Sequence, residues 1–390
     1  MIRFTNMPNP PTEALRKAGW EWMIGEDTVP YLVDQVVSVN TSEAENYYKA
    51  ANTLYEMFVE AGQYAIDQHL FKEMGIPENL IELVRQSWDD DRHTHLYGRF
   101  DFAGGIDGEP IKLLEFNADT ATCLPETAVV QWAQLMMNGH DEAAQFNAVY
   151  ETMVEQFRYI RRGNNDLTPS ILFSSLEGYP EDFANVTVLM EAAKEAGFET
   201  DHRFIHEVEF SSEQGIFKQD AETGHFVRYD FWFKLVPWEQ IAEDEPELTA
   251  MLTQLSRERK VLILNPAYTL LFQSKYILKI LWDLYPYHPL LLQTEARPLS
   301  YKQYVKKVIL GREGANVSIV QKDGTVLESV GGEYGEQPSV YQEYVALNQD
   351  EHGQSYQAGV FYAGEASGLG FRRGSKILDN KAQFVGHMVD

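Results

Sequence analysis

Residues 96–123 read LYGRFDFAGGIDGEPIKLLEFNADTATC, and this stretch decides how the rest of the chain is organised. Two short runs of alternating residues, 96–102 and 111–117, flank a turn that is rich in Gly and Asp. Alternation on both sides of such a turn predicts a β-hairpin.

The predicted hairpin has one polar face and one apolar face. Because successive side chains on a strand point to opposite faces, Arg99 and Asp101 share a face of the first strand. On the second strand Glu115, Asn117 and Asp119 share a face in the same way. The opposite faces carry the apolar residues Phe100, Phe102, Leu114 and Phe116. An arginine, three carboxylates and an amide on one surface suggest that it holds a cation or an anion.

The register of this hairpin requires an irregularity. A two-residue turn at Asp107-Gly108 would place Arg99 opposite Phe116 and send the two polar sets to opposite faces, since a slip of one residue reverses every side chain. Convergence of the polar sets needs an odd-length loop or a bulge. We predict it at Gly104-Gly105, because glycine favours such backbone irregularities.

Composition restricts the classes of function. With 44% hydrophobic residues among 390, the chain can bury a large core in one elaborate domain or two to three smaller ones. The single cysteine, Cys123, excludes an internal disulfide and fits a reducing compartment. The first 20 residues contain no signal-peptide-like apolar region, and no stretch approaches the roughly 20 apolar residues of a membrane helix. We therefore expect a cytoplasmic protein with no membrane partner.

The net charge of −27 argues against nucleic acid as a partner, because nucleic-acid binding depends on Lys and Arg neutralising phosphates. It is compatible with a cationic substrate such as a polyamine. One segment, 297–312, instead holds five basic residues and no acid. Such a segment in an acidic chain suggests an anion site, the alternative being a strand edge protected by lysines.

Hydrophobic periodicity divides the chain into three parts. The first is helical apart from the hairpin, with expected helices at 42–75, 77–88, 126–137 and 141–161 and a capping box at Ser42 and Glu45. The second alternates strands and helices and predicts a parallel sheet, with strands at 171–174, 202–210, 230–236 and 261–264 and helices at 181–196 and 274–284. The third predicts antiparallel strands at 305–310, 317–321, 326–330, 340–347, 357–362 and 376–378.

The polar face of the hairpin has the chemistry of a phosphoryl-transfer site. Asp101, Glu115 and Asn117 offer the oxygen ligands that Mg²⁺ takes together with water and substrate phosphates. Arg99 beside them suits an oxygen-rich anion, because its planar fork donates to two oxygens at once. The alternative is an Arg–carboxylate ladder on a solvent-facing hairpin, which contributes little to stability.

Three further patterns are weak when taken alone. Thr120 and Thr122 precede a helix that starts near Pro125 and suggest either an anion-binding nest or ordinary helix capping. Cys123 is either a reactive thiol or, more in keeping with its context, a small buried hydrophobe. Lys307 leads into a loop with Gly311 and Gly314 that suits nucleotide phosphates, and 367–373 resembles a second loop of glycine and arginine. No zinc, nucleophile-elbow, Walker A or dinucleotide motif is present.

Several motifs occur together in a fixed order: GRFDF, IKLLEFNADTATCLPE, FKLVPWE, NPAYTLLFQSKYILKILWDLYPYHPLLLQT, KKVILGREGANVSI, VYQEYVAL and ASGLGFRRG. In this combination, over roughly 14–388, the chain resembles the glutathionylspermidine synthetase family. It resembles most closely the short bacterial acid–amine ligase members that lack an amidase domain. The length of the chain and the absence of a Cys–His pattern before residue 96 agree with that subgroup.

The resemblance implies an α+β and α/β architecture with an ATP-grasp fold, in which ATP lies between two antiparallel-sheet subdomains. It implies one catalytic region over 1–390, with a pre-ATP-grasp-like α/β subdomain at about 168–265 and an ATP-binding lid and C-terminal subdomain at about 266–390. The implied reaction activates a carboxylate with ATP and Mg²⁺ as an acyl phosphate, which an amine then attacks. A glutathione-like acid and a polyamine-like amine are the implied substrates.

Roles follow from the motifs residue by residue. The resemblance implies that Arg99 stabilises the transferred phosphoryl group and that Asp101, Glu115 and Asn117 hold Mg²⁺. The implied acid-substrate residues are Thr120, Thr122 and Cys123. The implied ATP-binding residues are Arg99, Lys275, Lys307, Gly311, Gly314, Gln342, Tyr344 and Arg372, with Arg373 as the alternative to Arg372.

Two departures leave alternatives open. Threonines stand at 120 and 122 where the family has serines, which changes the shape of the acid pocket. A peptide or amino-acid ligase of the same fold, and a silent relative that only binds nucleotide, therefore remain as the alternative functions. The presence of Arg99, Asp101, Glu115 and Lys307 favours an active ligase.

Overall fold

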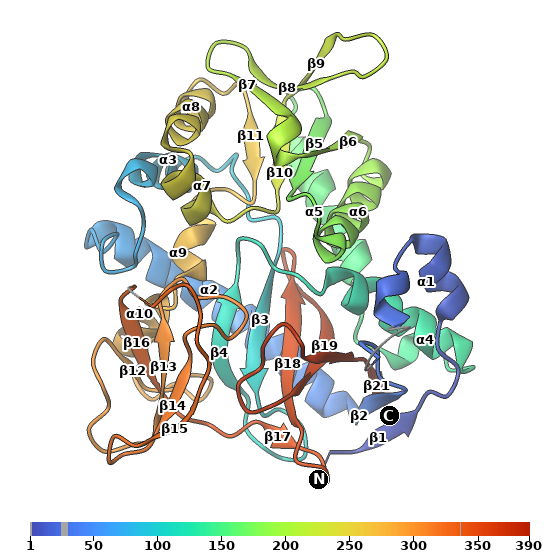
Figure 1. The fold of residues 1–390 in the computed structure, drawn as a ribbon, viewed down its shortest axis with the longest axis vertical. Coiled ribbons are helices and arrows are strands. Elements are labelled where there is room, and N and C mark those ends of the chain that lie inside the picture. The colour runs from blue at the N-terminus through green and yellow to red at the C-terminus, as the bar shows by residue number, and fades with distance from the viewer. Residues whose placement is uncertain (1, 25–29, 336) are drawn as a thin grey trace.

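The computed structural model describes residues 2–24, 30–335 and 337–390 and shows a mixed α/β protein. Figure 1 shows a parallel sheet with its helices in the upper part and two antiparallel sheets below it. The two ends of the chain meet in a small sheet of β1 (Phe4–Asn6), β2 (Gln35–Val39) and β21 (His387–Val389). The hairpin within 96–123 lies near the centre of this arrangement.

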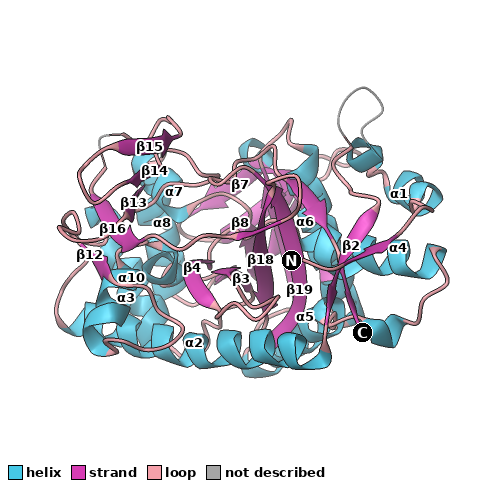
Figure 2. Cartoon of the chain, turned by 90° about the horizontal axis from the view of Figure 1, so that it is seen from below, coloured by secondary structure: helices cyan, strands magenta, loops and turns pink. Residues whose placement is uncertain are grey.

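The central sheet contains the hairpin together with strands from the C-terminal part of the chain. Its antiparallel order is β20 (Gln383–Val385), β19 (Ala366–Gly374), β18 (Ser355–Tyr362), β3 (Gly98–Ala103) and β4 (Lys112–Asn117), with β17 (Asn348–Gln349) paired to β18. The long helix α2 (Thr41–Asp67) packs against β18 and β19 and runs along one face of this sheet (Figure 2). The apolar face of the hairpin is buried on this side, where Phe100 stacks on Phe116 with ring centroids 3.8 Å apart.

The predicted irregularity of the hairpin is confirmed, but its predicted position at Gly104-Gly105 is wrong. The register shifts between Asp101 and Phe102, so that Leu114 is the extra residue of a β-bulge. Consequently Leu113, which is buried, takes the place on the apolar face that the alternation assigns to Leu114.

The parallel sheet that the second part of the sequence predicts is confirmed. Its order is β11 (Leu262–Leu264), β10 (Phe231–Lys234), β5 (Ser170–Ser175) and β6 (Glu199–Phe204), with all neighbours parallel. The helices around it are α5 (Val149–Gly163), α6 (Pro180–Glu195), α7 (Trp238–Asp244) and α8 (Pro246–Arg257). The strand expected at 202–210 is instead broken by η5 (Ile205–Glu207), after which β7 (Val208–Ser211), β8 (Gly215–Gln219) and β9 (Phe226–Tyr229) form a separate antiparallel sheet.

A five-stranded antiparallel sheet lies beside the hairpin. Its order is β12 (Thr294–Glu295), β16 (Ser339–Glu343), β13 (Tyr304–Val308), β14 (Ser318–Val320) and β15 (Val326–Ser329). The antiparallel texture predicted after residue 298 is thus confirmed. The strand expected at 376–378 is wrong, because these residues are irregular, and 367–373 is not a loop but most of β19.

The glycines of β19 explain why residues 367–373 form a strand and not the expected loop. A β-carbon at Gly368 would lie 2.3 Å from Val149 Cγ2, and one at Gly370 would lie 2.8 Å from the ring of Phe384. Glycine is therefore required here for close packing and not for a turn.

Most predicted helices exist with different ends. The helix α2 ends at Asp67 and not at residue 75, and its capping box is formed by Asn40 and Glu43 in place of Ser42 and Glu45. The helix expected from 141 begins only at Val149, and the helix expected at 274–284 is α10 (Ile277–Leu284), which begins three residues later and follows a separate short helix, α9 (Thr269–Gln273). The remaining helical elements are α1 (Thr12–Ala18), η1 (Glu21–Ile24), η2 (Glu78–Leu80), α3 (Ile81–Asp89), η3 (Glu126–Val130), α4 (Gln131–Met137) and η4 (Glu142–Ala144).

Among the described residues, no helix combines the length and the apolar character needed to cross a membrane.

Candidate active site

The bulge brings the polar sets of the hairpin onto one face. Arg99 lies opposite Asn117, and Asp101 lies opposite Glu115. Without the extra residue Leu114, the register of the turn would place Arg99 opposite Phe116. The predicted convergence of these four polar side chains is therefore confirmed, and the bulge is its physical cause.

Arg99 is buried, and each of the three nitrogens of its guanidinium group donates a hydrogen bond. Its Nε and Nη2 donate to the two carboxylate oxygens of Asp101 at 2.7 and 3.0 Å, and its Nη1 donates to the Thr122 carbonyl at 2.6 Å. Burial, the largest single effect, lowers the pKa of the guanidinium, but Asp101, Cys123 and Glu115 together outweigh burial and raise this pKa. Asn117 Nδ2 donates to the same carboxylate of Asp101 at 3.1 Å. The result is a fixed cation beside a fixed carboxylate.

Glu115 meets a lysine from a distant part of the chain. Lys275 lies between α9 and α10, and its Nζ is 3.3 Å from Glu115 Oε2 and donates to the Gly311 carbonyl at 2.6 Å. Burial alone would raise the pKa of the Glu115 carboxyl, but Lys275 and then Lys307 lower it to about 2. Glu115 is therefore a carboxylate at neutral pH.

Lys307 of β13 binds the backbone of the bulge. Its Nζ donates to the Leu114 carbonyl at 3.0 Å and to Gln342 Oε1 at 2.8 Å, and Gln342 Nε2 donates to the Leu113 carbonyl at 3.2 Å. These bonds connect the five-stranded sheet to the hairpin. Burial lowers the pKa of Lys307 to about 8. Tyr344, the other residue expected on this side, lies just beyond the end of β16.

The loop after β13 reaches back to the segment after β4. Arg312 Nη1 donates to Thr120 Oγ1 at 2.7 Å, and its Nε and Nη2 donate to Glu239 Oε1 at 3.2 and 2.6 Å. Gly314 follows in a left-handed conformation with φ 71°, where a β-carbon would lie 2.4 Å from the Leu378 carbonyl oxygen. The predicted loop residues Gly311 and Gly314 and the predicted substrate residue Thr120 therefore belong to one contiguous region.

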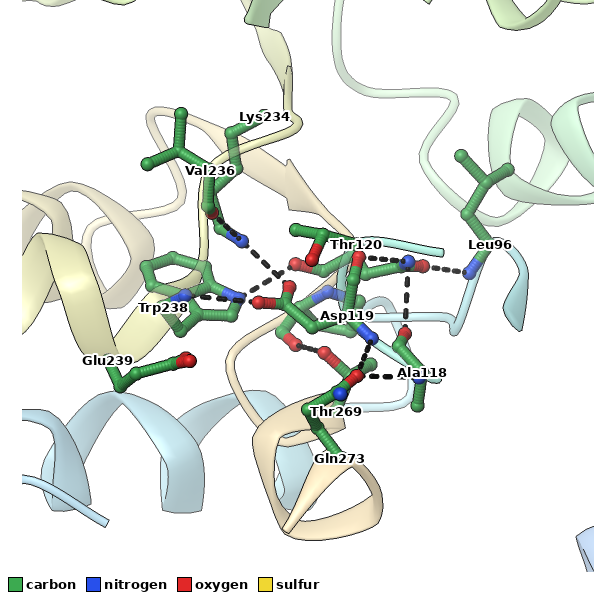
Figure 3. A network of polar contacts seen from close by, with 12 residues as sticks. Leu96, Ala118, Asp119, Thr120, Lys234, Val236, Trp238, Glu239, Thr269 and Gln273 are labelled. Atoms are coloured by element: carbon green, nitrogen blue, oxygen red, sulfur yellow. Dashed lines mark hydrogen bonds and ion pairs between the residues drawn. The ribbon is translucent and has the colours of Figure 1, made fainter. Parts of the chain in front are cut away.

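A buried polar network supports this region (Figure 3). Asp119 accepts from Lys234 Nζ at 2.7 Å and from the backbone N–H of Trp238 at 3.0 Å, and the side chains of Asp119 and Lys234 are fully buried. Asn265 Nδ2 donates to the carbonyls of Ala118 and Asp119 at 3.1 and 2.9 Å. The third carboxylate of the predicted polar face is thus part of the core.

Sequence reasoning missed most of this network. Lys234 and Glu239 occur in the quoted motif FKLVPWE, and Asn265 and Gln273 occur in the next motif. The signal available was a lysine inside an otherwise apolar strand, because a buried lysine needs a carboxylate partner.

Thr122 and Cys123 lie immediately before the first helical turn that follows the hairpin. Thr122 is exposed and presents its carbonyl to Arg99, whereas Cys123 has φ 66° and its Sγ is 3.9 Å from Tyr31 Oη. Burial, followed by the nearby Glu126, raises the pKa of the Cys123 thiol. A raised pKa disfavours the thiolate and with it the reactive-thiol interpretation.

Arg372 and Arg373 are consecutive residues of β19, so their side chains point to opposite faces of the sheet. Arg372 lies in register with Gln357 and lines a pocket with Arg99, Asp101 and Cys123. Its Nε is buried and has no hydrogen-bond partner. Arg373 points to the opposite face, where its Nη2 is 3.5 Å from Asp350 Oδ2. Of the two alternatives, Arg372 is the one on the face of Arg99.

Two acidic residues of α6 lie near Glu313, which follows Arg312 in the loop. Glu181 and Asp182 are in the first turn of α6, and the charge of Glu313 contributes to raising the pKa of both carboxyl groups. Burial, then Glu181 and Glu313, raises the pKa of Asp182 to about 7. This grouping of carboxyl groups would favour a cationic neighbour.

Comparison with known proteins assigns the chain to a protein family. The family model for glutathionylspermidine synthase preATP-grasp matches residues 3–390. The chain belongs to this family. The family is one of C–N ligases, so the chain is a member of an enzyme family that forms carbon–nitrogen bonds.

Individual relatives agree with this assignment. The "Putative acid--amine ligase" of Haemophilus influenzae is 29% identical over 99% of this chain and 99% of its own length. The bifunctional glutathionylspermidine synthetase/amidase of Escherichia coli is 26% identical over 87% of this chain and 56% of its own length. The trypanothione synthetase of Crithidia fasciculata is 26% identical over 83% of this chain. The chain spans about half the length of these last two relatives.

Among solved structures, the glutathione synthetase-like effector GSS30 from Globodera pallida in its apo form has a TM-score of 0.56, with 11% identity, over 98% of this chain and 99% of that chain. This similarity shows that the two proteins share a mixed α/β fold.

Proposed function

We propose that this protein is an ADP-forming acid–amine ligase with an ATP-grasp architecture. One observation supports the proposal best. Three segments far apart in the sequence bring Arg99, Asp101, Glu115, Lys275 and Lys307 together on one face of the hairpin. An arginine, carboxylates and lysines in one place are the usual apparatus for stabilising a transferring phosphoryl group.

ATP binds between the central sheet and the five-stranded sheet in this proposal. Lys275 and Lys307 contact its phosphates, and the loop containing Gly311 and Gly314 covers them. Gln342 and Tyr344 lie on the adenine side, and Arg372 approaches from β19. Residues at about 168–265 would form the pre-ATP-grasp-like subdomain, and residues at about 266–390 would form the lid and C-terminal subdomain. The last strands of the latter, β18 to β20, complete the central sheet.

Asp101, Glu115 and Asn117 would hold Mg²⁺. Two facing carboxylates and an amide oxygen fit the preference of Mg²⁺ for oxygen ligands completed by water and phosphates. In the described part of the chain, no group of three or more His, Cys, Asp or Glu side chains is arranged to hold a metal by itself, so substrate phosphates would complete the shell. When bound, Mg²⁺ neutralises charge on the nucleotide phosphates.

The reaction proceeds in two steps. A carboxylate oxygen of the acid attacks the γ-phosphorus of ATP, the bond to the β,γ-bridging oxygen breaks, and an acyl phosphate and ADP are formed. Arg99 donates to the transferring group, where negative charge is spread over the equatorial oxygens. The amine nitrogen then attacks the acyl carbon, loses a proton and expels inorganic phosphate, which leaves an amide.

The two substrates enter from opposite sides of the loop that carries Arg312. The acid lies near Thr120, Thr122 and Cys123, next to Arg99. The acidic residues at the start of α6 make the other side suitable for a cationic amine, which favours a polyamine over an amino acid.

The test is ADP release from Mg·ATP with glutathione and spermidine together, with each alone, and then with a panel of acids and amines. Release that requires both an acid and an amine supports the ligase, and the best pair identifies its substrates. Binding of Mg·ATP in calorimetry without ADP release from any pair would favour a nucleotide-binding relative. Absence of ATP binding would contradict the ATP-grasp assignment.

A further inference from the structure

The side chain of Arg99 lies across a glycine on the neighbouring strand. In the pairing of β3 with β18, Gly359 lies opposite Asp101, and Phe361 lies opposite Arg99. Gly359 is therefore the diagonal neighbour of Arg99 on the same face of the sheet. A β-carbon on Gly359 would lie 3.0 Å from Arg99 Cδ, 3.4 Å from Nε and 3.5 Å from Cγ.

Arg99 has little freedom to move away from such a carbon. Its guanidinium donates to both oxygens of Asp101 and to the Thr122 carbonyl, at distances from 2.6 to 3.0 Å. A shift of Cδ by a few tenths of an ångström would lengthen or break these hydrogen bonds. A buried guanidinium with broken hydrogen bonds is costly, so the side chain is fixed by its surroundings.

We infer that Gly359 is a positioning residue for Arg99, because a side chain at 359 would press on Arg99 Cδ and displace the guanidinium from Asp101. The functional half of this inference rests on the proposed ligase activity. The structural half, that a side chain at 359 would collide with Arg99, stands without it.

Two other glycines of the same sheet provide matched comparisons. Gly370 pairs with Gly359 across β18 and β19, but its β-carbon would meet the Phe384 ring at 2.8 Å and Thr127 Oγ1 at 3.1 Å. Gly374, near the end of β19, has room, since its nearest neighbour would be Ala382 Cβ at 3.5 Å. None of the three has a left-handed backbone conformation, so alanine is compatible with the backbone at each.

The first experiment measures turnover of Gly359→Ala, Gly359→Val and Gly374→Ala with Mg·ATP and the best acid–amine pair. Gly359→Ala should lower kcat by less than the about 10²-fold that a displacement of about 1 Å can cost, because the shift that it forces is a few tenths of an ångström, and Gly359→Val should lower kcat further. The KM for ATP should change little, because Arg99 acts on the transferring group. Gly374→Ala should retain the activity of the unaltered protein.

The second experiment measures thermal unfolding and needs no activity. Gly359→Ala and Gly370→Ala should each lower Tm in the unaltered background. In an Arg99→Ala background the collision partner of residue 359 is gone, so the effect of Gly359→Ala should disappear while that of Gly370→Ala persists. Such non-additivity is the signature of direct contact between two side chains.

The outcomes separate this inference from the proposed function. A Gly359→Ala effect on Tm that is equal in both backgrounds would overturn the inference, as would unchanged kcat and Tm in both Gly359 variants. If the unaltered protein releases no ADP with any substrate pair, the proposed function fails, and the unfolding experiment still decides whether Gly359 positions Arg99.

Discussion

Two cation–carboxylate clusters lie only four residues apart in the sequence and serve different purposes. At residue 119 the pair Asp119–Lys234 is fully buried, with a distance of 2.7 Å between carboxylate oxygen and Nζ. At residue 115 the corresponding distance to Lys275 is 3.3 Å, and the Glu115 side chain is 27% exposed. The chemical groups are the same, and their surroundings are not.

The difference lies in how completely protein groups surround each pair. The second oxygen of Asp119 accepts from the Trp238 N–H, and Lys234 also donates to the Val236 carbonyl and lies 4.3 Å from the centre of the Trp238 ring. The charges of this pair are therefore satisfied by protein groups alone. Glu115 is instead partly exposed on the polar face of the hairpin, and in the proposed function a nucleotide and a cation replace its contact with Lys275. A closed ion pair maintains architecture, and an open one binds ligands.

Removal of one partner of the closed pair should have the largest effect. Lys234→Met leaves Asp119 buried without its cation and should lower the free energy of unfolding by about 3–5 kcal/mol. Urea denaturation measures this loss. Lys194→Met, which removes an exposed lysine paired with Glu191, is the control and should have little effect. A loss for Lys234→Met as small as that of the control would show that the closed pair does not stabilise the fold.

Removal of the arginine of the open cluster should affect chemistry more than stability. Arg99→Ala should lower kcat for ADP release by about 10³-fold, because one donor to the developing charge is lost. The Kd for Mg·ATP in calorimetry should change little. Arg373→Ala, on the opposite face of β19, is the matched control and should retain full turnover. A parallel loss of ATP binding in Arg99→Ala would contradict a role confined to the transition state.

The metal requirement tests whether the open cluster exchanges partners. Asp101→Asn should raise the Mg²⁺ concentration for half-maximal activity by about tenfold, since a neutral amide is a weaker ligand. A magnesium titration of ADP release measures this change. Glu109→Gln in the exposed turn of the same hairpin should leave the titration unchanged. An unchanged titration for Asp101→Asn as well would remove Asp101 from the proposed ligands.

The pH dependence of nucleotide binding tests the lysine side of the open cluster. Burial lowers the pKa of Lys307 to about 8 in the free protein, so its charge is present below about pH 8 and lost above it. Affinity for Mg·ATP should therefore fall as pH rises through 8, by up to about tenfold per unit. Calorimetry across this range should also show proton uptake near pH 8, because bound phosphates raise the pKa of Lys307.

Two further observations check this assignment. Lys307→Arg keeps its charge and should flatten the pH dependence. Because the unfolded chain binds more protons than the folded chain between about pH 8 and 10.5, Lys307 should make the free energy of unfolding rise with pH across that window. A pH-independent affinity in the unaltered protein would contradict a phosphate-binding Lys307.

The smallest effect is expected at Cys123, which lines the pocket together with Arg99 and Asp101. Burial raises the pKa of the Cys123 thiol, so Cys123→Ala should change kcat little when ADP release is measured near neutral pH. A collapse of turnover with the fold and ATP binding preserved would instead show that the thiol takes part in the reaction.

Much of this arrangement follows from local sequence patterns. The alternation of the hairpin predicts which of its side chains share a face, and the strand–helix alternation after residue 168 predicts the parallel sheet. These predictions succeed because a period of two or of 3.6 residues is a property of a few consecutive residues. The resemblance of the motifs to a known family added Lys275 to the proposed ATP-binding residues.

Other features depend on contacts that no local pattern contains. The bulge falls at Leu114, and the carbonyls of Leu114 and Leu113 accept from Lys307 and Gln342, which lie almost 200 and more than 200 residues further on. Residues 367–373 look like a glycine loop, yet they form a strand because Val149 and Phe384 pack where β-carbons would be. The face of Arg372, and not Arg373, depends on the register of that strand.

The sequence by itself therefore determined the hairpin, its polar face and the parallel sheet, because each rests on the directions of neighbouring side chains. Only the tertiary structure decided which carboxylate of that face is enclosed by protein groups and which remains partly exposed. Asp119 is enclosed by Lys234, Trp238 and Asn265, whereas Glu115 meets Lys275 beside a loop that leaves it partly exposed. Burial depends on every segment packed around a group, and no single stretch of sequence contains them all.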